Sequence, residues 1–447
     1  MSTNKIAEKI QQAIKDSYWP GYVHTYPHKR VYTHLGKLDF HKLWGQHLEH
    51  VNLYIHVPFC EQRCSYCNIF TTVCSHQERD GLFEKYLDRL FDEIEYYANI
   101  VNKDVTIASL YFGGGTPTLL SINQLDSIVR KLREAFANWD DSLEVCIEST
   151  PEILSAAYLK GLASIGFKRV SIGVQSFSSE ELRDANRCVE IESFRDMHEF
   201  AHSLGLNTNI DLIYGLPHQD EESIISNLKK AISFNPETIT VYPLAIRELT
   251  GIERTNNAEL LSMEEKYSMF DKIRDLLESS GYMCQTVTRF IRNEKSTYQQ
   301  QCYEYQGVPT IGLGAGARSY APDVHYCMPY MVNNVLANNV FNDYMCKDIS
   351  EVEYDGFVFN TDEHKRKHIM LNLLHPGLDI DSYQIKFNSV LVDDFKEELD
   401  ALLELGLIEN THQVLKLTKI GRKYSDIVAS VFESEQVKHA YSSYTAK

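Results

Sequence analysis

The sequence predicts an α/β fold, in which a partial (β/α)6 barrel is followed by a small winged-helix-like α+β domain. Three observations predict it. From residue 51 onward, short apolar stretches alternate with amphipathic stretches of helical period, which is the pattern of parallel βαβ units. Cysteine, glycine and charged residues follow several of the apolar stretches, at the positions where strands would end. After residue 362 the pattern changes to helix, helix and hairpin, and this predicts the C-terminal domain.

Length and composition describe an ordinary globular protein. The 447 residues are enough for two or three domains, and 43% of them are hydrophobic while 24% are charged. No stretch approaches the roughly 20 apolar residues of a membrane span, and the N-terminus begins as an amphipathic helix rather than a signal peptide. A net charge of −18 disfavours nucleic-acid binding. We therefore expect a cytoplasmic protein that binds neither membrane nor nucleic acid.

These patterns divide the chain into an N-terminal arm over residues 1–48, a barrel over 49–350 and a C-terminal domain over 351–447. Aromatic and basic residues crowd the arm between residues 18 and 30. Two interpretations of this segment stay open. It folds over a cavity and contacts an anionic substrate, or it packs on the barrel as a structural arm.

The barrel elements follow one another in a regular order. Six stretches are expected to be strands, over residues 53–58, 108–112, 143–148, 169–175, 209–217 and 238–244. Helical spacing predicts helices between them, such as one over residues 80–100 with Leu82 and Leu90 on one face. A capping box at Ser121 and Gln124 predicts the start of the next helix. Right-handed crossovers would curl such strands into a partial barrel, with ligands at their C-terminal ends.

Beyond the sixth strand the pattern is less regular. A capping box at Ser262 and Glu265 predicts a helix to about residue 280, and residues 283–290 are expected to form a further strand. The C-terminal domain is expected to hold helices over residues 362–374 and 395–405 and a hairpin over 406–410 and 414–418. Because acidic residues are abundant there, we expect this domain to pack on the barrel or close a cavity rather than bind DNA.

Three cysteines follow the first predicted strand as C-x3-C-x2-C. Cys60, Cys64 and Cys67 cannot complete a tetrahedral zinc site, which takes four ligands. They suit a [4Fe–4S] cluster bound through three irons, with the fourth iron open to another ligand. Cys74 is either a spare ligand or a bystander. The remaining cysteines of the ten are scattered, which indicates reduced cytosolic thiols.

Other residues at predicted strand ends have the chemistry to bind a small organic cofactor. Gly113, Gly114 and Gly115 would let the backbone approach a ligand without a Cβ clash. Glu148 is placed to accept hydrogen bonds from ribose hydroxyls, and the guanidinium fork of Arg187 would pair with a carboxylate. Each of these residues also has a purely structural interpretation. The glycines could form only a tight turn, Glu148 could be a solvated charge, and Arg187 could belong to a surface ion pair.

The triad at the end of the first strand resembles the cluster motif of the radical S-adenosylmethionine (SAM) superfamily. A closer resemblance, to the oxygen-independent coproporphyrinogen III oxidase family, extends from about Leu53 to Phe432. It is carried by Tyr54-Ile55-His56-Val57-Pro58-Phe59-Cys60, Gly113-Gly114-Gly115-Thr116-Pro117-Thr118, Ser171-Ile172-Gly173-Val174-Gln175-Ser176-Phe177 and Asp211-Leu212-Ile213-Tyr214-Gly215-Leu216-Pro217.

This resemblance implies a [4Fe–4S] cluster, cleavage of SAM to a 5′-deoxyadenosyl radical, and an electron donor such as flavodoxin or ferredoxin. The residues implied to bind the cluster-bound SAM are Tyr54, Gly114, Thr116, Glu148, Gln175, Arg187 and Asp211. Ile213 and Ala245 would lie near a second SAM molecule. His56, like Tyr54, is a candidate catalytic group near the cluster, and for His56 a proton-handling role and a core position stay equally open.

The sequence departs from the true oxidases at one position. They carry a fourth cysteine two residues after the third, where this chain has Ile69. That departure favours a two-SAM enzyme that transfers a methyl or methylene group to an sp2 carbon of a small molecule. Oxidative decarboxylation of a coproporphyrinogen-like tetrapyrrole comes second and a haem-binding chaperone third.

Overall fold

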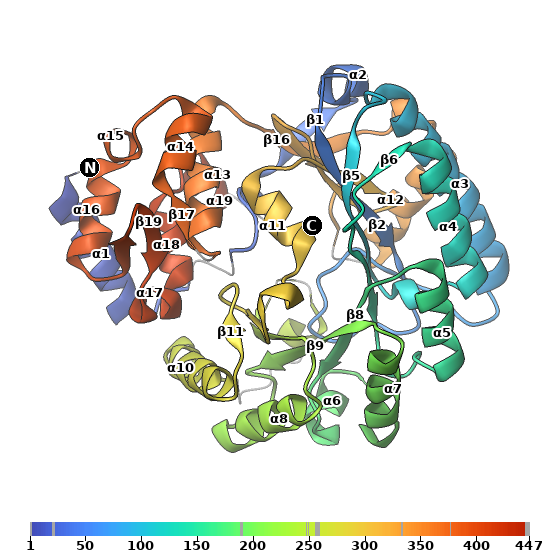
Figure 1. Cartoon of the computed structure of the whole chain (residues 1–447), viewed down its shortest axis with the longest axis horizontal. Helices are drawn as coiled ribbons and strands as arrows, with labels where there is room; N and C mark the ends of the chain where they lie inside the picture. The colour runs from blue at the N-terminus through green and yellow to red at the C-terminus, as the bar shows by residue number, and fades with distance from the viewer. Residues whose placement is uncertain are drawn as a thin grey trace.

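The computed structural model describes the chain except residues 1, 20–22, 188–190, 247, 249, 255–259, 332, 333, 376 and 443–447. Within the described residues, a 14-stranded sheet forms the centre of the molecule, and Figure 1 shows it flanked by helices on its outer side. Its strand order is β1-β16-β15-β14-β13-β2-β5-β7-β8-β9-β10-β12-β11, with β6 paired to β5.

The middle of this sheet is parallel and curves as a partial barrel. Its strands are β13 (Thr310–Leu313), β2 (His50–Val57), β5 (Thr106–Gly114), β7 (Val145–Ser149), β8 (Arg169–Gln175), β9 (Asn207–Tyr214) and β10 (Thr238–Pro243). The predicted fold class is thus confirmed. Strand β13 was not predicted, because it follows β10 only after a long, irregular stretch and then pairs with β2.

Antiparallel strands extend both edges. On the β13 edge lie β14 (Arg318–Tyr320), β15 (Val324–Cys327), β16 (Tyr354–Val358) and β1 (Thr33–Gly36), and on the β10 edge lie β12 (Arg289–Ile291) and β11 (Met283–Cys284). The prediction of one strand over residues 283–290 was wrong. The chain turns back on itself, and the Gln285 amide donates to the Arg289 carbonyl at 2.9 Å.

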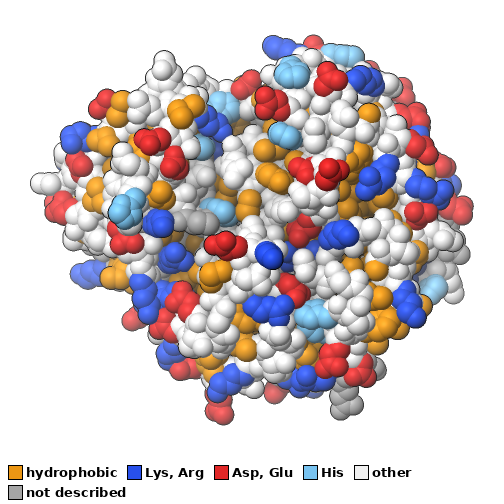
Figure 2. Space-filling model, in the orientation of Figure 1, with side chains coloured by type: hydrophobic (Ala, Val, Ile, Leu, Met, Phe, Trp, Pro, Cys, Tyr) orange, Lys and Arg blue, Asp and Glu red, His pale blue; other side chains and the backbone are white. Residues whose placement is uncertain are grey.

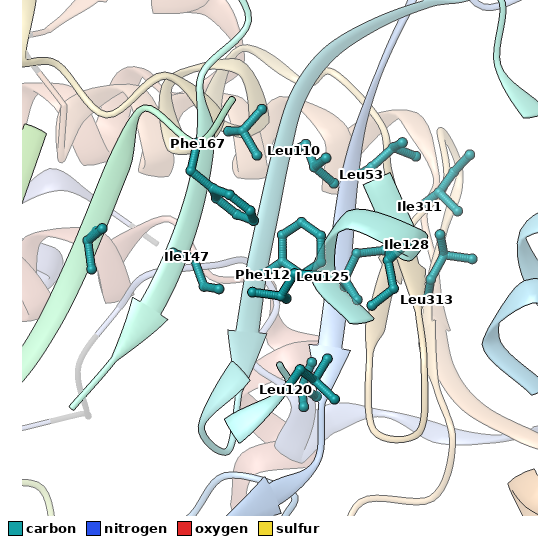
Figure 3. Packing of buried hydrophobic residues seen from close by; sticks show 14 of the residues in the cluster. Leu53, Leu110, Phe112, Leu120, Leu125, Ile128, Ile147, Phe167, Ile311 and Leu313 are labelled. Atoms are coloured by element: carbon teal, nitrogen blue, oxygen red, sulfur yellow. The ribbon is translucent and has the colours of Figure 1, made fainter. Parts of the chain in front are cut away.

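Helices cover the outer face of the sheet. They are α3 (Arg79–Ile100), α4 (Ile122–Ala135), α5 (Ala156–Ile165), α7 (Ile191–Ser203), α8 (Glu221–Ser233) and α10 (Met263–Ser279). Both predicted capping boxes form, at the starts of α4 and α10. Figure 3 shows Leu53, Leu110 and Phe112 of the strands packed with Leu125 and Ile128 of α4. Alternation along each strand turns the residues between them to the concave face.

The C-terminal domain has its own hydrophobic core and a three-stranded sheet of order β17-β19-β18. Its elements are α13 (Thr361–Leu373), β17 (Leu378–Asp379), α14 (Ile380–Phe387), α15 (Leu391–Asp394), α16 (Lys396–Glu404), β18 (Ile408–Thr411), β19 (Val414–Leu417), α17 (Lys419–Lys423), α18 (Ser425–Val431) and α19 (Glu435–Ser442). Helix α1 (Thr3–Lys15) joins this core through Ala7 and Ile10, and Figure 1 shows it beside α16.

Shorter elements connect these layers. They are β3 (Phe59–Cys60), β4 (Thr72–Val73), β6 (Asn138–Trp139), α2 (Phe40–Trp44), α6 (Ser179–Asp184), α9 (Gly251–Arg254), α11 (Gln299–Gln306), α12 (Asn334–Cys346) and 3-10 turns at Lys29–Val31, Pro117–Leu119, Glu294–Ser296 and Ile349–Glu351. Helix α11 contacts β2, β5 and α13, so it links the barrel to the C-terminal domain.

In the described part of the chain, no helix has both the length and the apolar character needed to cross a bilayer. Figure 2 shows acidic and basic side chains interspersed over one face of the molecule.

Candidate active site

The three predicted cluster cysteines lie in one loop at the C-terminal end of β2. Strands β3 and β4 pair and so close this loop, and the Thr72 amide donates to the Pro58 carbonyl at 2.6 Å. Within the loop, the Cys67 amide donates to the Cys64 carbonyl at 3.1 Å. The chain therefore folds the C-x3-C-x2-C segment back over the end of its own strand.

The thiols fit a cluster better than a single ion. Burial raises the pKa of Cys60 to about 12 and also raises that of Cys67, so these thiols ionise only beside a strong positive charge such as bound iron. Among the described residues, no three His, Cys, Asp or Glu side chains gather as ligands of one metal ion. A cluster that takes one thiolate on each of three separate irons matches this spacing.

Two neighbouring segments hold the cysteine loop. The Asn186 side-chain amide donates to the Arg63 carbonyl at 2.8 Å, and the Ser65 amide donates to the Ala185 carbonyl at 3.1 Å. The Ile252 amide of α9 in turn donates to the Ser65 carbonyl at 2.8 Å. Segments that follow β8 and β10 therefore fix a loop that follows β2.

The predicted glycines lie against this loop. Gly114 has a φ of +114°, which favours glycine, and a Cβ on Gly115 would lie 3.0 Å from the Cys60 sulfur. The Thr116 amide donates to the Phe59 carbonyl at 2.8 Å, and the Thr116 hydroxyl lies 3.7 Å from the same sulfur. The predicted run from Gly113 to Thr116 thus lies directly beside the thiols.

Glu148 reaches the same place from β7. Its carboxylate accepts hydrogen bonds from the Tyr111 hydroxyl at 2.7 Å and the Gly114 amide at 3.2 Å. Burial raises the pKa of Glu148 to about 7, and the nearby Asp211 contributes to the shift. Asp211 of β9 itself accepts hydrogen bonds from Ser171, at 2.8 Å, and from Asn209. Both predicted carboxylates therefore face the lumen of the barrel in fixed orientations.

Arg187 is buried beside the cysteine loop, so the alternative of a surface ion pair is wrong. Its guanidinium donates to the Gly173 carbonyl at 2.8 Å and to the Tyr66 hydroxyl at 3.3 Å, and it lies 3.9 Å from the Cys64 sulfur. Gln175 ends β8 with a φ of +68°, and its side chain lies over Gly173. Arg187 is therefore available to a carboxylate bound next to the cysteines.

Tyr54 and His56 form a chain of hydrogen bonds on β2. Burial lowers the pKa of His56 to about 4, so its imidazole is neutral. Its Nε2–H donates to the Phe70 carbonyl at 2.9 Å, and its Nδ1 accepts from the Tyr54 hydroxyl at 3.0 Å. Both ring nitrogens are thus occupied, and His56 ties the cysteine loop to the strand that carries it.

The remaining predicted residues differ in how they are placed around the cysteine loop. Ile213 packs with Tyr66 in a small apolar cluster, and Ala245 is partly exposed just after β10. Ile69 is 41% exposed, whereas Cys74 is buried in the core with its amide on the Cys60 carbonyl. Lys29 of the predicted arm lies within electrostatic range of His56. Residues 20–22 of the arm lie outside the described part of the chain.

Sequence reasoning missed a charged group on the other side of the same face. Arg318 of β14 has Tyr54 and Glu304 of α11 within electrostatic range, and Lys367 of α13 also acts on Glu304. Lys29, from the crowded part of the arm, acts on His56 together with Arg318. The glycine-rich stretch before Arg318 was the available signal, but nothing local showed that it pairs with β2.

A separate surface hollow of about 570 Å³ lies at the start of α8. Phe177, Asp220 and Asn227 are among its lining residues, and none of the predicted cofactor residues lines it. It is therefore not part of the candidate site.

Comparison with known proteins connects this geometry to a family. The model of the radical SAM superfamily matches residues 54–231. The oxygen-independent coproporphyrinogen III oxidase of Salmonella typhimurium is 28% identical over 390 residues, which are 83% of each chain. That of Pseudomonas aeruginosa is 29% identical over 407 residues, which are 86% of this chain and 85% of the relative.

Two further similarities bear on the fold and on the range of functions. The heme chaperone HemW of Buchnera aphidicola is 24% identical over 384 residues, which are 86% of this chain and 98% of that protein. The solved structure of coproporphyrinogen III oxidase from Escherichia coli superposes with a TM-score of 0.76 at 24% identity. The superposition covers 95% of this chain and 98% of the other. The barrel and the C-terminal domain of this chain therefore have the same folds as the corresponding parts of that structure.

Proposed function

We propose that the chain is a radical SAM protein of the type to which the oxygen-independent coproporphyrinogen III oxidases and HemW belong, and that it oxidises a coproporphyrinogen-like tetrapyrrole. A [4Fe–4S] cluster and SAM are its cofactors, and when bound they supply a 5′-deoxyadenosyl radical able to abstract hydrogen. The curated relatives favour this activity over the methyl or methylene transfer that the sequence alone placed first.

The observation that carries the proposal is the convergence of predicted residues from β2, β5, β7 and β8 at one end of the barrel. Cys60, Cys64 and Cys67 would hold the cluster, and Arg187 beside Cys64 would pair with the SAM carboxylate. Glu148, fixed by two hydrogen bonds, would accept the ribose hydroxyls.

The chain's other residues would shape and protect this site. The backbone at Gly114 and Gly115 approaches the cysteine loop closely and leaves room for the methionyl group beside the thiols. Neutral His56 would act as a positioning residue that holds Tyr54 and the loop together. The C-terminal domain and α11 would close the open side of the barrel and limit the entry of water.

Transfer of a methyl or methylene group to an sp2 carbon is the second candidate. The exposed Ile69, in the position where the oxidases carry a fourth cysteine, favours it. In that case a second SAM would lie near Ile213 and Ala245. A haem-binding chaperone is the third candidate, supported by the similarity to HemW.

Anaerobic assay of the cluster-loaded protein separates these candidates. Oxidative decarboxylation turns a propionate side chain into a vinyl group with loss of CO2, one hydrogen atom and one electron, so the assay contains SAM, a reduced flavodoxin or ferredoxin, and an electron acceptor. We expect coproporphyrinogen III to yield CO2 and 5′-deoxyadenosine, and Cys60→Ala to yield neither. S-adenosylhomocysteine without CO2 would favour transfer instead. Stoichiometric haem binding without turnover would favour the chaperone, and either result would overturn the proposal.

A further inference from the structure

The concave face of the sheet continues from the cofactor residues across the antiparallel strands. Thr310 of β13 pairs with Asn52 of β2 on one side and with Tyr320 of β14 on the other. Paired residues, and residues two apart in one strand, share a face of a sheet. Tyr54, two residues after Asn52, and Arg318, two before Tyr320, therefore lie on the same face.

Arg318 is deep in the molecule and only partly accessible. Its electrostatic neighbours are the phenols of Tyr320, Tyr32 and Tyr330. In the described part of the chain, its guanidinium makes no hydrogen bond or ion pair. A guanidinium has five N–H donors and is always charged, so Arg318 presents unused donors in a confined space.

Two further donors near Arg318 also lack acceptors. His325 is 1% exposed, and its Nε2 accepts a hydrogen bond from Lys367 at 2.9 Å. The hydrogen of this neutral ring is therefore on Nδ1, which has no partner among the described residues, and the same is true of the buried Tyr32 hydroxyl. Both groups interact electrostatically with Arg318. Donors without acceptors are costly to bury, so their concentration indicates a missing acceptor.

The charged groups around Arg318 carry an excess of positive charge, which also indicates a missing anion. Arg318 and Lys367 are two cations, and Glu304 is the facing carboxylate. Burial lowers the pKa of Lys367 and raises that of Glu304. Within the described part of the chain, the Glu304 carboxylate makes no hydrogen bond or ion pair with either cation. An anion bound between the cations would reduce the cost of keeping them in a confined, poorly solvated space.

We infer that Arg318 and Lys367, with the Tyr32 hydroxyl and the His325 Nδ1–H, form a site for one carboxylate of a small molecule. For the identity of that molecule the inference rests on the proposed function. The carboxylate is a propionate of the tetrapyrrole or, with the same chemistry, the carboxylate of a second SAM. In either case the site fixes the ligand on the β14 side of the concave face.

Binding titrations test this site with the anaerobic, cluster-loaded protein. The probes are coproporphyrin III, which carries four carboxylates, and its tetramethyl ester, which carries none, both followed by fluorescence. Arg318→Met should weaken coproporphyrin III binding about 10- to 100-fold, the usual effect of losing hydrogen bonds to a charged group. The affinity of Arg318→Lys for coproporphyrin III should lie between those of the unmodified protein and Arg318→Met, because lysine keeps the positive charge but lacks the paired N–H donors of the guanidinium. Arg130→Met, which removes an exposed arginine of α4, is the matched control and should have no effect.

The ester separates a carboxylate site from a merely structural role. Its affinity should be the same in all variants, and Glu304→Gln should tighten coproporphyrin III binding by removing the competing negative charge. If Arg318→Met weakens acid and ester equally, or weakens neither while SAM binding also stays unchanged, the inference is wrong. Iron and sulfide contents equal to those of the unmodified protein establish that each variant is folded.

Two additional measurements complete the test: the first identifies the source of the carboxylate, and the second separates this inference from the proposed function. Equilibrium dialysis with SAM counts bound molecules, and loss of one SAM in Arg318→Met with unchanged coproporphyrin III affinity would assign the carboxylate to SAM. If coproporphyrinogen III releases no CO2 but Arg318→Met still weakens the acid and not the ester, the proposed function fails while the carboxylate site stands.

Discussion

The two sides of the concave face differ in how their charged groups are held. On the cysteine side, Glu148 and Arg187 each have two or more hydrogen-bond partners within the protein. On the β14 side, Arg318 and Glu304 are nearly as deep, yet the described residues give them no direct partner. Groups fixed before binding suit cofactors that must be oriented accurately, whereas groups left open suit a ligand that completes their hydrogen bonds. The predictions below test this contrast.

The largest effect is expected from the cysteines. Cys60→Ala, Cys64→Ala and Cys67→Ala should each abolish the cluster and all formation of 5′-deoxyadenosine, because three thiolates are the expected minimum for its binding. Iron and sulfide analysis with electron paramagnetic resonance measures the first, and chromatography the second. Cys74→Ala is the control and should keep the cluster, because Cys74 packs in the core. Loss of the cluster in that variant would contradict our ligand assignment.

Destabilising the C-terminal domain should affect the β14 side, to which α13 contributes Lys367, before it affects the cysteine side. Ile10 of α1 is 3% exposed in the core of that domain, so Ile10→Ala should cost about 2 to 5 kcal/mol of its stability. Hydrogen exchange should rise in α13 and α16 and change little in β2 and β5. Gln11→Ala, on the exposed side of the same helix, is the control. Equal exchange increases in both domains would show that the two cores do not respond separately.

A substitution on the cysteine side should weaken the binding of SAM without changing ligand binding at the carboxylate site around Arg318. In Glu148→Gln the amide cannot accept from both Tyr111 and Gly114, so the side chain loses its charge and its fixed orientation. We expect SAM to bind about 10-fold more weakly, as for a lost hydrogen bond to a charged group. Equilibrium dialysis measures this, with the exposed Glu134→Gln as control. Unchanged SAM affinity would exclude Glu148 from the SAM site.

The smallest effect is expected from Glu237, a carboxylate that stabilises the fold and is not part of the candidate site. Burial opposes ionisation of Glu237, but His202, the Thr208 amide and Arg292 together lower its pKa from 4.5 to about 2. The ionised form therefore stabilises the fold at neutral pH, and this contribution is lost as the pH falls from about 4.5 towards 2. Glu237→Gln should cost about 1 kcal/mol at pH 7, with a smaller difference at pH 3. Urea unfolding at both values measures it, and a difference that grows at low pH would contradict the assignment.

Sequence patterns predicted the cysteine side well because its residues follow strands that are continuous in the chain. The short apolar stretch around Tyr54 and the capping box at Ser121 placed a strand and a helix near their observed positions. The β14 side was missed because β13 pairs with β2 across a large separation in sequence, and such pairing leaves no local signal. The same holds for α1, whose amphipathic pattern did not reveal that it completes the C-terminal core.

The sequence by itself determined the local features of this protein: its strand and helix periods, the spacing of its candidate cluster-binding cysteines, and the residues at the ends of the parallel strands. Only the tertiary structure decided that Arg187 is buried beside Cys64, that His56 has both nitrogens occupied, and that Arg318 lies near Tyr54 although it comes from another strand. The physical reason is that periodicity and spacing act over a few residues, whereas burial, hydrogen-bond satisfaction and charge balance depend on which distant strands and helices pack together.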